Sequence, residues 1–243
     1  MEPDDSAKPI VNKPEADLSI QPLTLAEIEA AAKKRVSRID KEFKEGFEFI
    51  KNQPKSVSFF GSSRMKKESI HYGQAVKLAA RLATLGYSVL TGAGPGIMEA
   101  ANRGAKEAGG RSVGLSIKLP QAQVQNAYVT EKAEFYYFFT RKVMLSFAAE
   151  AYIFFPGGFG TLDEFFEIVT LVQTNKIEPV PIICVGTDFW NKLNDFIYNE
   201  MYKKHDAIVQ SDLRLYHITD NEDEVVEIVS KVPIRNGVRY FTQ

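Results

Sequence analysis

Short apolar segments alternate with longer segments of helical periodicity along the chain from residue 57 onward, and this alternation predicts the fold. The apolar segments fall at residues 57–60, 87–91, 112–117, 134–138, 151–155, 180–185 and 215–219. The helical segments fall at residues 69–85, 96–109, 140–149, 161–174, 189–203 and 221–231. Strands that are apolar on both faces are typical of a parallel sheet covered on both sides. We therefore predict an α/β fold of the doubly wound, Rossmann-like class, with a mostly parallel sheet and helices on both faces.

A long helix is predicted ahead of this alternation. Thr24 begins the sequence Thr-Leu-Ala-Glu, which is typical of a helix N-terminus, and apolar residues then recur at helical spacing as far as Ile50. Residues 1–22 carry four prolines and little hydrophobic pattern, which favours a flexible arm. We expect a flexible arm over residues 1–22, an amphipathic helical extension over residues 23–52, and a single Rossmann-like domain over residues 53–243.

The composition argues against several classes of protein. Thirty basic and 31 acidic residues give a net charge of −1, which provides no electrostatic footprint for nucleic acid or for an anionic membrane. The single cysteine, Cys184, can form no internal disulfide, and the three histidines lie far apart in sequence, so we expect no metal site. The first residues do not resemble a secretory signal and no apolar run approaches membrane-spanning length, so we expect a cytoplasmic protein.

Glycine-containing loops follow three of the predicted strands, at residues 61–63, 92–96 and 156–161. Glycine lets the backbone approach an anion closely, and the helix that follows directs free N–H groups to the same place. The carboxyl ends of parallel strands meet at one edge of a sheet, so the three loops predict a site for a small phosphate-bearing ligand. Each loop can also be interpreted as an ordinary tight connection between a strand and a helix.

The third loop and the helix before it each allow a structural and a functional interpretation. Thr161 and Glu164 have the spacing of a capping box, with Thr161 as the N-cap, so both residues could serve only the helix that follows. Upstream, Arg141 and Lys142 open a predicted helix, where cations oppose the helix dipole by roughly 0.3–1 kcal/mol each. A site that needs positive charge would explain this cost, and two solvated surface cations are the alternative.

Two segments resemble a known family. Thr-Arg-Lys at residues 140–142 and PGGFGTLDE at residues 156–164 resemble the LONELY GUY (LOG) family, whose hallmark is PGGxGTxxE. Residues 59–63 and 91–110 resemble the other two loops of the family, and the likeness extends over about residues 56–229. The N-terminal helix and a long insertion between the third and fourth predicted strands look like the larger bacterial branch of the family.

The resemblance implies an enzyme. Family members have often been labelled lysine decarboxylases and are similar in activity to cytokinin riboside 5′-monophosphate phosphoribohydrolases. The implied reaction is hydrolysis of the N-glycosidic bond of a purine nucleoside 5′-monophosphate, either AMP or an N6-substituted AMP, to free base and ribose 5-phosphate, without a cofactor. The resemblance also implies a homodimer or a larger assembly of dimers, such as a hexamer.

Residue by residue, the resemblance makes Arg141 and Glu164 the catalytic pair. The position of Glu164 near the start of a helix is expected to lower its pKa and keep it anionic, so that it stabilises positive charge on the ribose. Arg141 would orient the nucleotide. The expected substrate-binding residues are Ser62, Gly94, Lys142, Gly157, Gly158, Phe159, Gly160, Thr161, Leu162, Asp163 and Thr170.

Two departures from the family pattern bear on base specificity. Ala93 stands where the family usually has the second of three glycines, and its side chain is expected to restrict how closely this backbone approaches a ligand. The insertion offers only Gln121, Gln123 and Gln125 where the family has an acidic residue that contacts the base. An acceptor for the N6–H group of a substituted adenine would therefore come from a glutamine or from elsewhere.

Two other functions fit parts of the pattern. Molybdenum-cofactor carrier proteins resemble this fold and loop layout, and a non-catalytic carrier would need the glycine turn but neither Arg141 nor Glu164. A pyridoxal-phosphate decarboxylase would need a Schiff-base lysine, for which Lys142 is the candidate, and a partner for the pyridinium nitrogen, which the sequence does not mark. The presence of both Arg141 and Glu164 favours the phosphoribohydrolase.

Overall fold

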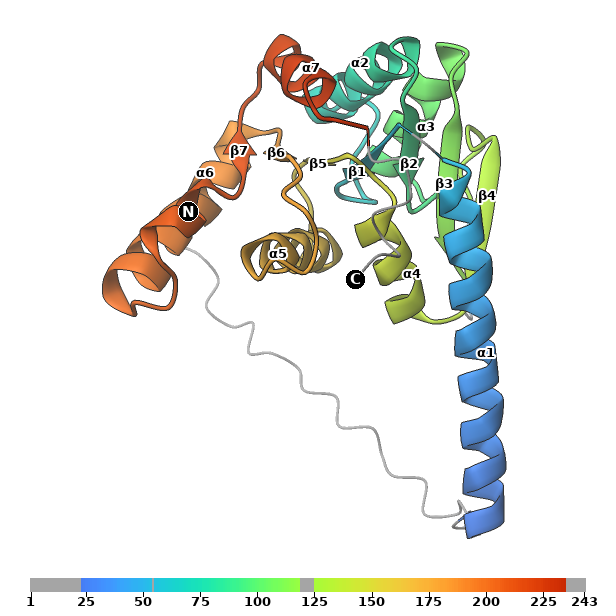
Figure 1. Ribbon diagram of the computed structural model, residues 1–243. Coiled ribbons are helices and arrows are strands. Elements are labelled where there is room, and N and C mark those ends of the chain that lie inside the picture. Colours follow the sequence, from blue (N-terminus) through green and yellow to red (C-terminus); the bar gives the residue numbers. More distant parts are fainter. Residues whose placement is uncertain (1–22, 54, 119–124, 235–243) are drawn as a thin grey trace, which may run out of the picture. The chain divides into compact units, whose positions relative to one another are not determined.

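A seven-stranded sheet forms the centre of the fold (Figure 1). The computed structural model describes residues 23–53, 55–118 and 125–234. The strands lie in the order β4-β3-β2-β1-β5-β6-β7, and every neighbouring pair is parallel. The prediction of a doubly wound α/β fold is therefore confirmed. The strands are β1 (Ser56–Phe60), β2 (Ser88–Thr91), β3 (Ser112–Ile117), β4 (Glu131–Phe135), β5 (Ala151–Phe154), β6 (Ile182–Cys184) and β7 (His217–Ile218).

Helices cover both faces of this sheet (Figure 1). One face carries α2 (Ile70–Thr84), α3 (Ile97–Glu107) and α7 (Glu222–Ser230), and the other carries α4 (Phe138–Phe147), α5 (Phe159–Gln173) and α6 (Thr187–Phe196). A π-helical segment, Ile197–Lys204, continues α6, and a 3₁₀ turn spans Gln210–Arg214. Successive residues of the strands enter opposite cores, so that Phe59 packs under α2 and α3 whereas Phe60 packs under α4 and α5.

The N-terminal helix α1 spans Leu25–Lys51 and contributes to two compact units, which divide after Arg38. In the first unit the apolar side chains of Ile28 and Val36 are exposed. In the second unit Ile50 belongs to the core on the α4 and α5 face of the sheet. The apolar stripe of α1 is thus covered only in its later part.

Some predictions fall outside the described residues. They concern the arm over residues 1–22, the last residues 235–243, and the glutamines Gln121 and Gln123 of the insertion. The division of the chain into an arm, a helix and one catalytic domain stays a prediction.

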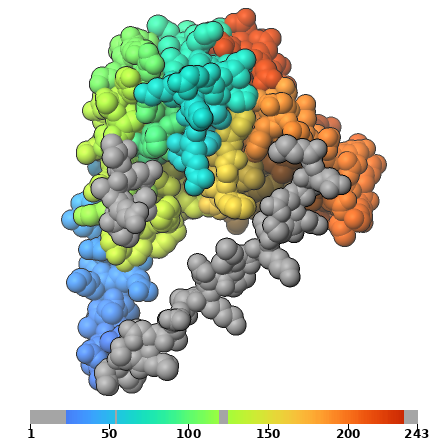
Figure 2. Space-filling view, turned by 180° about the vertical axis from the view of Figure 1, so that it is seen from behind, coloured from blue at the N-terminus to red at the C-terminus, as the bar shows by residue number. Residues whose placement is uncertain are grey.

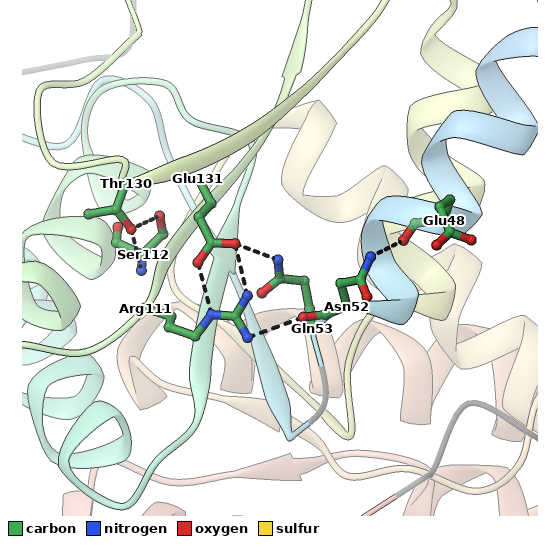
Figure 3. Close-up of polar contacts among 7 residues, drawn as sticks. All are labelled: Glu48, Asn52, Gln53, Arg111, Ser112, Thr130 and Glu131. Atoms are coloured by element: carbon green, nitrogen blue, oxygen red, sulfur yellow. Dashed lines mark hydrogen bonds and ion pairs between the residues drawn. The ribbon is translucent and has the colours of Figure 1, made fainter.

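A polar cluster fastens the end of α1 to the amino-terminal edge of the sheet (Figure 3). Arg111, before β3, donates from Nε and Nη2 to the two carboxylate oxygens of Glu131, each at 2.8 Å. Gln53, just after α1, donates to Glu131 Oε2 at 2.9 Å, and the carbonyl oxygen of Asn52 accepts from Arg111 Nη1 at 3.1 Å. The Arg111 guanidinium holds the pKa of Glu131 below its usual value. The cluster therefore joins α1 to the starts of β3 and β4 through a charge-assisted, bidentate pair.

The strand predicted at residues 134–138 is β4, which begins three residues earlier, at Glu131. The aromatic run that follows β4 has the propensity of a strand. In the structure, however, the amides of Tyr136 and Tyr137 donate to the carboxylate of Glu42 rather than to a neighbouring strand. The chain then enters α4, which begins two residues before the predicted start of that helix.

Two helical glycines have opposite surroundings, and we expect opposite effects of alanine at the two positions. A Cβ at Gly104 in α3 would overlap the carbonyl oxygen of Val76 in α2, whereas a Cβ at Gly73 in α2 would meet nothing within 4 Å. Gly104→Ala should lower the free energy of unfolding by about 1–3 kcal/mol, because the two helices must separate. Gly73→Ala should raise it by up to about 1 kcal/mol, because alanine favours a helix. Denaturant unfolding followed by circular dichroism measures both changes, and equal effects would contradict the close packing of α2 on α3.

Candidate functional site

A cavity of about 760 Å³ lies at the carboxyl ends of β1 and β5. The strand order reverses between these two strands. Strands β2, β3 and β4 follow β1 on one side, whereas β6 and β7 follow β5 on the other side. A crevice at such a reversal is the usual ligand site of a doubly wound sheet. Residues of α4 and of the first two turns of α5 complete the wall.

The main chain of Ser62 joins the three loops at this edge. Its amide donates to the carbonyl oxygen of Pro156 at 3.0 Å, and its carbonyl oxygen accepts from the amide of Ile97 at 3.1 Å. A Cβ at Gly96, whose φ is +69°, would overlap the same carbonyl oxygen, so glycine is required there. Figure 2 shows the segment after β1 (cyan) beside the segment after β5 (yellow). The loops after β1, β2 and β5 therefore form one connected surface.

Glu164 lies in the second turn of α5 and not at its N-terminal cap. The helix begins at Phe159 with Gly158 as the N-cap, and the amides of Thr161 and Leu162 both donate to the Gly158 carbonyl oxygen. The predicted capping box of Thr161 and Glu164 is wrong, because α5 begins two residues earlier than predicted. The Glu164 side chain lines the cavity, is 6% exposed, and has no hydrogen-bond partner for Oε2 among the described residues.

Burial changes the expected charge of Glu164. Desolvation raises its pKa from 4.5 to about 7, and the cations Lys142 and Arg141 oppose this rise only in part. The acidic neighbours Glu167 and Asp163 add to the rise. The prediction of a lowered pKa is therefore wrong, because the helix dipole acts mainly within the first turn and Glu164 lies beyond it. At neutral pH the side chain is present in both its protonated and its ionised form.

Arg141 reaches the same cavity from α4. Because α4 begins at Phe138, Arg141 is the fourth residue of the helix and not the second. The unfavourable interaction of its charge with the helix dipole is therefore weaker than predicted. Its guanidinium carbon lies 5.3 Å from the centroid of the Phe138 ring, and its Nε has no hydrogen-bond partner among the described residues. Burial lowers the pKa of Arg141, but a guanidinium stays cationic at neutral pH. The half-buried Arg141 and the buried carboxyl group of Glu164 thus line one cavity, and each has a buried polar atom without a hydrogen-bond partner among the described residues.

Lys142, the next residue, is an ion-paired cation. Its Nζ lies 2.8 Å from Asp163 Oδ2 and 2.7 Å from Glu167 Oε2. Burial alone would lower the pKa of Lys142, but the two carboxylates outweigh burial and raise it. An anionic ligand at Lys142 would have to compete with both carboxylates.

Most of the predicted site residues line the cavity, and four do not. The carbonyl oxygen of Gly94 accepts from Asn126 Nδ2 at 2.9 Å. Gly157 packs against the side chain of Thr161, in the first turn of α5. Leu162 and Thr170 line a neighbouring open depression on α5. The predicted residues that line the cavity are Ser62, Arg141, Lys142, Gly158, Phe159, Gly160, Thr161, Asp163 and Glu164.

Sequence reasoning missed the apolar wall of the cavity and three polar residues. Ser63 and Arg64 line it directly after Ser62, and Glu167 holds Lys142 from one turn beyond Asp163. Much of the wall could have been predicted from position alone, because many of its residues lie at the end of a strand or at the start of a helix that follows a glycine-containing loop. Its apolar members are Phe59, Phe60, Met98, Ile117, Phe138 and Leu145.

Within residues 23–53, 55–118 and 125–234, no three His, Cys, Asp or Glu side chains are grouped so that they could hold a metal ion. No helix in these ranges has both the length and the apolar character that crossing a membrane requires.

The sequence matches a protein family. A family profile described as "Possible lysine decarboxylase" matches residues 98–229, which is more than half of the chain, and the chain therefore belongs to this family, the LOG family. A cytokinin riboside 5′-monophosphate phosphoribohydrolase of Arabidopsis thaliana, LOG5, is 26% identical over 198 residues, which are 79% of this chain and 84% of that protein. A second Arabidopsis thaliana enzyme of the same name, LOG3, is 30% identical over 142 residues, which are 57% of this chain and 65% of that protein.

Solved structures share the fold. The structural-genomics target TM1055 superposes with a TM-score of 0.55 at 24% identity and covers 73% of this chain and 99% of its own. A molybdenum cofactor binding protein from Rippkaea orientalis gives a TM-score of 0.53 at 19% identity, covering 72% of this chain and 93% of its own. The Moco carrier protein of Chlamydomonas reinhardtii gives 0.52 at 21% identity, with 73% and 96% covered. At these identities the likeness concerns the fold alone.

Replacing Glu164 by glutamine is expected to stabilise the folded protein at alkaline pH. The folded-state pKa of about 7 lies above the ordinary 4.5, so the folded protein keeps a proton that the unfolded chain releases between these values. The contribution of Glu164 to stability therefore falls as the pH rises through this window, by roughly 3 kcal/mol once both states are ionised. Glu164→Gln, which carries no charge, should exceed the wild type by up to this amount at pH 8 and match it at pH 4.

Thermal unfolding at the two pH values measures this difference. Glu68→Gln is the matched control, because Glu68 is exposed and its neutralisation should change stability little at either pH. A Glu164→Gln variant that is less stable than the wild type at pH 8 would contradict the burial of an unsatisfied carboxyl group.

Proposed function

We propose that the protein hydrolyses the N-glycosidic bond of a purine nucleoside 5′-monophosphate and releases the free base and ribose 5-phosphate. The observation that carries this proposal is that the half-buried Arg141 and the buried Glu164 line one cavity beside the glycine turn before α5. A carboxyl group with a pKa near the working pH suits proton transfer, and a protein that only carries a ligand has no need of one. The printed names of the curated relatives support the same reaction.

The start of α5 is the proposed site for the 5′-phosphate. The amides of Phe159 and Gly160 belong to the first turn of α5 and donate to no acceptor among the described residues. Both residues line the cavity, at the positive end of the helix dipole, where anions bind well. Lys142 can take part only where the phosphate displaces one of its carboxylate partners, so we assign the main phosphate contacts to backbone N–H groups.

The apolar wall is the proposed site for the base. Met98, Ile117 and Phe138 present apolar surface to the cavity, which suits a planar purine ring. The guanidinium of Arg141 lies beside the Phe138 ring, so negative charge that develops on a departing base would find a cation nearby. We propose adenine or an N6-substituted adenine as the base, following the cytokinin-type substrates in the names of the relatives.

In the proposed reaction, Glu164 transfers a proton from the attacking water to the departing base. The bond between C1′ of the ribose and the ring nitrogen breaks, and the ribose passes through a state with oxocarbenium character that an ionised Glu164 stabilises. The oxygen of a water molecule then bonds to C1′, Glu164 accepts the proton of this water, and the proton passes to the departing base. A pKa of about 7 lets the same carboxyl group accept and return the proton near neutral pH.

The expected assembly and location also remain proposals. Phe138 and Phe159, which line the cavity, are 56% and 95% exposed, and the adjacent Phe139 is 46% exposed, which together leave an apolar surface open. We propose that a second copy of the chain covers this surface in a homodimer or in a larger assembly of dimers. A cytoplasmic location and the lack of nucleic-acid or membrane partners stay predictions from the sequence.

A panel of nucleoside 5′-monophosphates, with and without N6 substituents, tests the activity. We expect equal amounts of free base and ribose 5-phosphate from at least one purine nucleotide, measured by chromatography. Glu164→Gln should lower turnover by about 100-fold or more, while nucleotide affinity changes little. Base release that is unchanged in Glu164→Gln would remove the role assigned to Glu164. Binding of AMP without any base release by the wild type would favour a non-catalytic carrier of the molybdenum-cofactor type.

Alanine substitutions in the glycine turn are expected to separate packing from binding. A Cβ at Gly157 would overlap the Thr161 hydroxyl, whereas a Cβ at Gly158 or Gly160 would meet nothing within 4 Å of the protein. Gly157→Ala should therefore lower stability by about 1–3 kcal/mol. Gly160→Ala should leave the melting temperature unchanged or slightly raised, because alanine favours a helix. It should weaken AMP binding about tenfold or more, because the methyl group takes the place of the phosphate. Calorimetric titration with AMP measures the affinity, and full affinity in Gly160→Ala would contradict the proposed phosphate site.

A further inference from the structure

We propose that Glu42, in α1, is a positioning residue for the cationic part of the site, an inference that rests on the proposed function. Its side chain is 9% exposed. Oε1 accepts from the amide of Tyr136 at 2.8 Å, and Oε2 accepts from the amide of Tyr137 at 3.3 Å and from the hydroxyl of Thr140 at 2.6 Å. All three donors belong to the segment that begins α4.

Glu42 supplies what the start of α4 lacks in its own sequence. The N-cap residue, Tyr137, makes no side-chain capping bond. The amides of Tyr136 and Tyr137 lie just before the first helical residue, Phe138, and Glu42 gives both an acceptor. Its carboxylate also lies at the positive end of the α4 dipole, where negative charge is favourable. The donors are 94 to 98 residues away from Glu42 in sequence. The position at which α4 begins is therefore set in part by α1.

The placement of Arg141 depends on this start. Arg141 directly follows Thr140, whose hydroxyl contacts Glu42. The Nε of Arg141 has no hydrogen-bond partner among the described residues, and the guanidinium rests beside the Phe138 ring of the same helix turn. A Cβ at Gly92 would lie 3.5 Å from Arg141 Nη1, so the side chain also passes close to the second loop. A shift of the first turn of α4 would move the guanidinium in the cavity, and a displacement of about 1 Å can cost about 100-fold in rate.

The other anchor of α1 provides a matched control. Glu131 binds Gln53 and Arg111 at the amino-terminal edge of the sheet, and none of these three residues lines the cavity (Figure 3). Glu42→Gln and Glu131→Gln each replace one accepting oxygen by an NH₂ group, which cannot accept a hydrogen bond. Both changes loosen the attachment of α1, but only Glu42→Gln disturbs the start of α4.

Steady-state kinetics on the best nucleoside monophosphate of the panel test the proposal. We expect kcat to fall at least tenfold in Glu42→Gln and to stay within about twofold of the wild type in Glu131→Gln. Thr140→Val, which lacks the hydroxyl, should lower kcat in the same direction, and Thr140→Ser, which keeps the hydroxyl, should restore it. Equal kcat values in Glu42→Gln and Glu131→Gln would overturn the proposal.

A double substitution shows whether Glu42 acts through Arg141. The variant with both Glu42→Gln and Arg141→Ala should bind AMP no more weakly than Arg141→Ala alone, because a side chain that is absent cannot be misplaced. Calorimetric titration of the single and double variants measures this coupling. Independent, additive losses of affinity would overturn a role that runs through Arg141.

Hydrogen exchange separates failure of this proposal from failure of the proposed function. In the protein without ligand, Glu42→Gln should speed exchange of the α4 amides about tenfold or more relative to Glu131→Gln. Where the wild type releases no base from any nucleotide, the proposed function fails, and the exchange rates still test the contact of Glu42 with α4. Unchanged exchange in α4 of Glu42→Gln overturns the positioning role whatever the activity of the wild type.

Discussion

The main-chain hydrogen bonds that join Ser62 to Pro156 and to Ile97 are the constraint on which the candidate site depends. The bond from its amide to Pro156 continues the pairing of β1 with β5 beyond the strands, after the bond from the Phe155 amide to the Phe60 carbonyl oxygen at 2.8 Å. The glycine turn is therefore an extension of the sheet and not a free loop. Because α5 begins directly after this turn, the same bonds also fix where its first amides and its second turn lie.

The position of Glu164 is held by its neighbour in the core. Phe165 is fully buried, and its ring centroid lies 5.6 Å from that of Phe154 and 5.0 Å from that of Trp190. This packing prevents α5 from turning Glu164 toward solvent, so the carboxyl group stays desolvated and its pKa stays high. The site thus keeps a locally unfavourable group that the surrounding core outweighs, as is common where function requires it.

The sheet could be predicted from the sequence because its strands are apolar throughout and its loops are rich in glycine. The positions of α4 and α5 could be predicted only to within two residues. This error led to the wrong prediction for the pKa of Glu164. Thr161 and Glu164 have the spacing of a capping box, but the helix begins at Phe159, so Glu164 lies one turn further in and is buried. The start of α4 depends on Glu42, more than 90 residues away, and no local pattern contains that contact. Long-range contacts and burial are the terms that sequence periodicity omits.

The charge state of Lys142 bears on the decarboxylase label of the family. A lysine that forms a Schiff base with pyridoxal phosphate must lose its proton to attack, so such lysines have a lowered pKa. Lys142 has the opposite environment, because Asp163 and Glu167 both lie within 2.8 Å of its Nζ and raise its pKa. The arrangement does not fit a Schiff-base lysine. It fits a cation that holds two carboxylates of α5 against α4, whereas Arg141 and Glu164 keep buried hydrogen-bonding atoms that a substrate can still use.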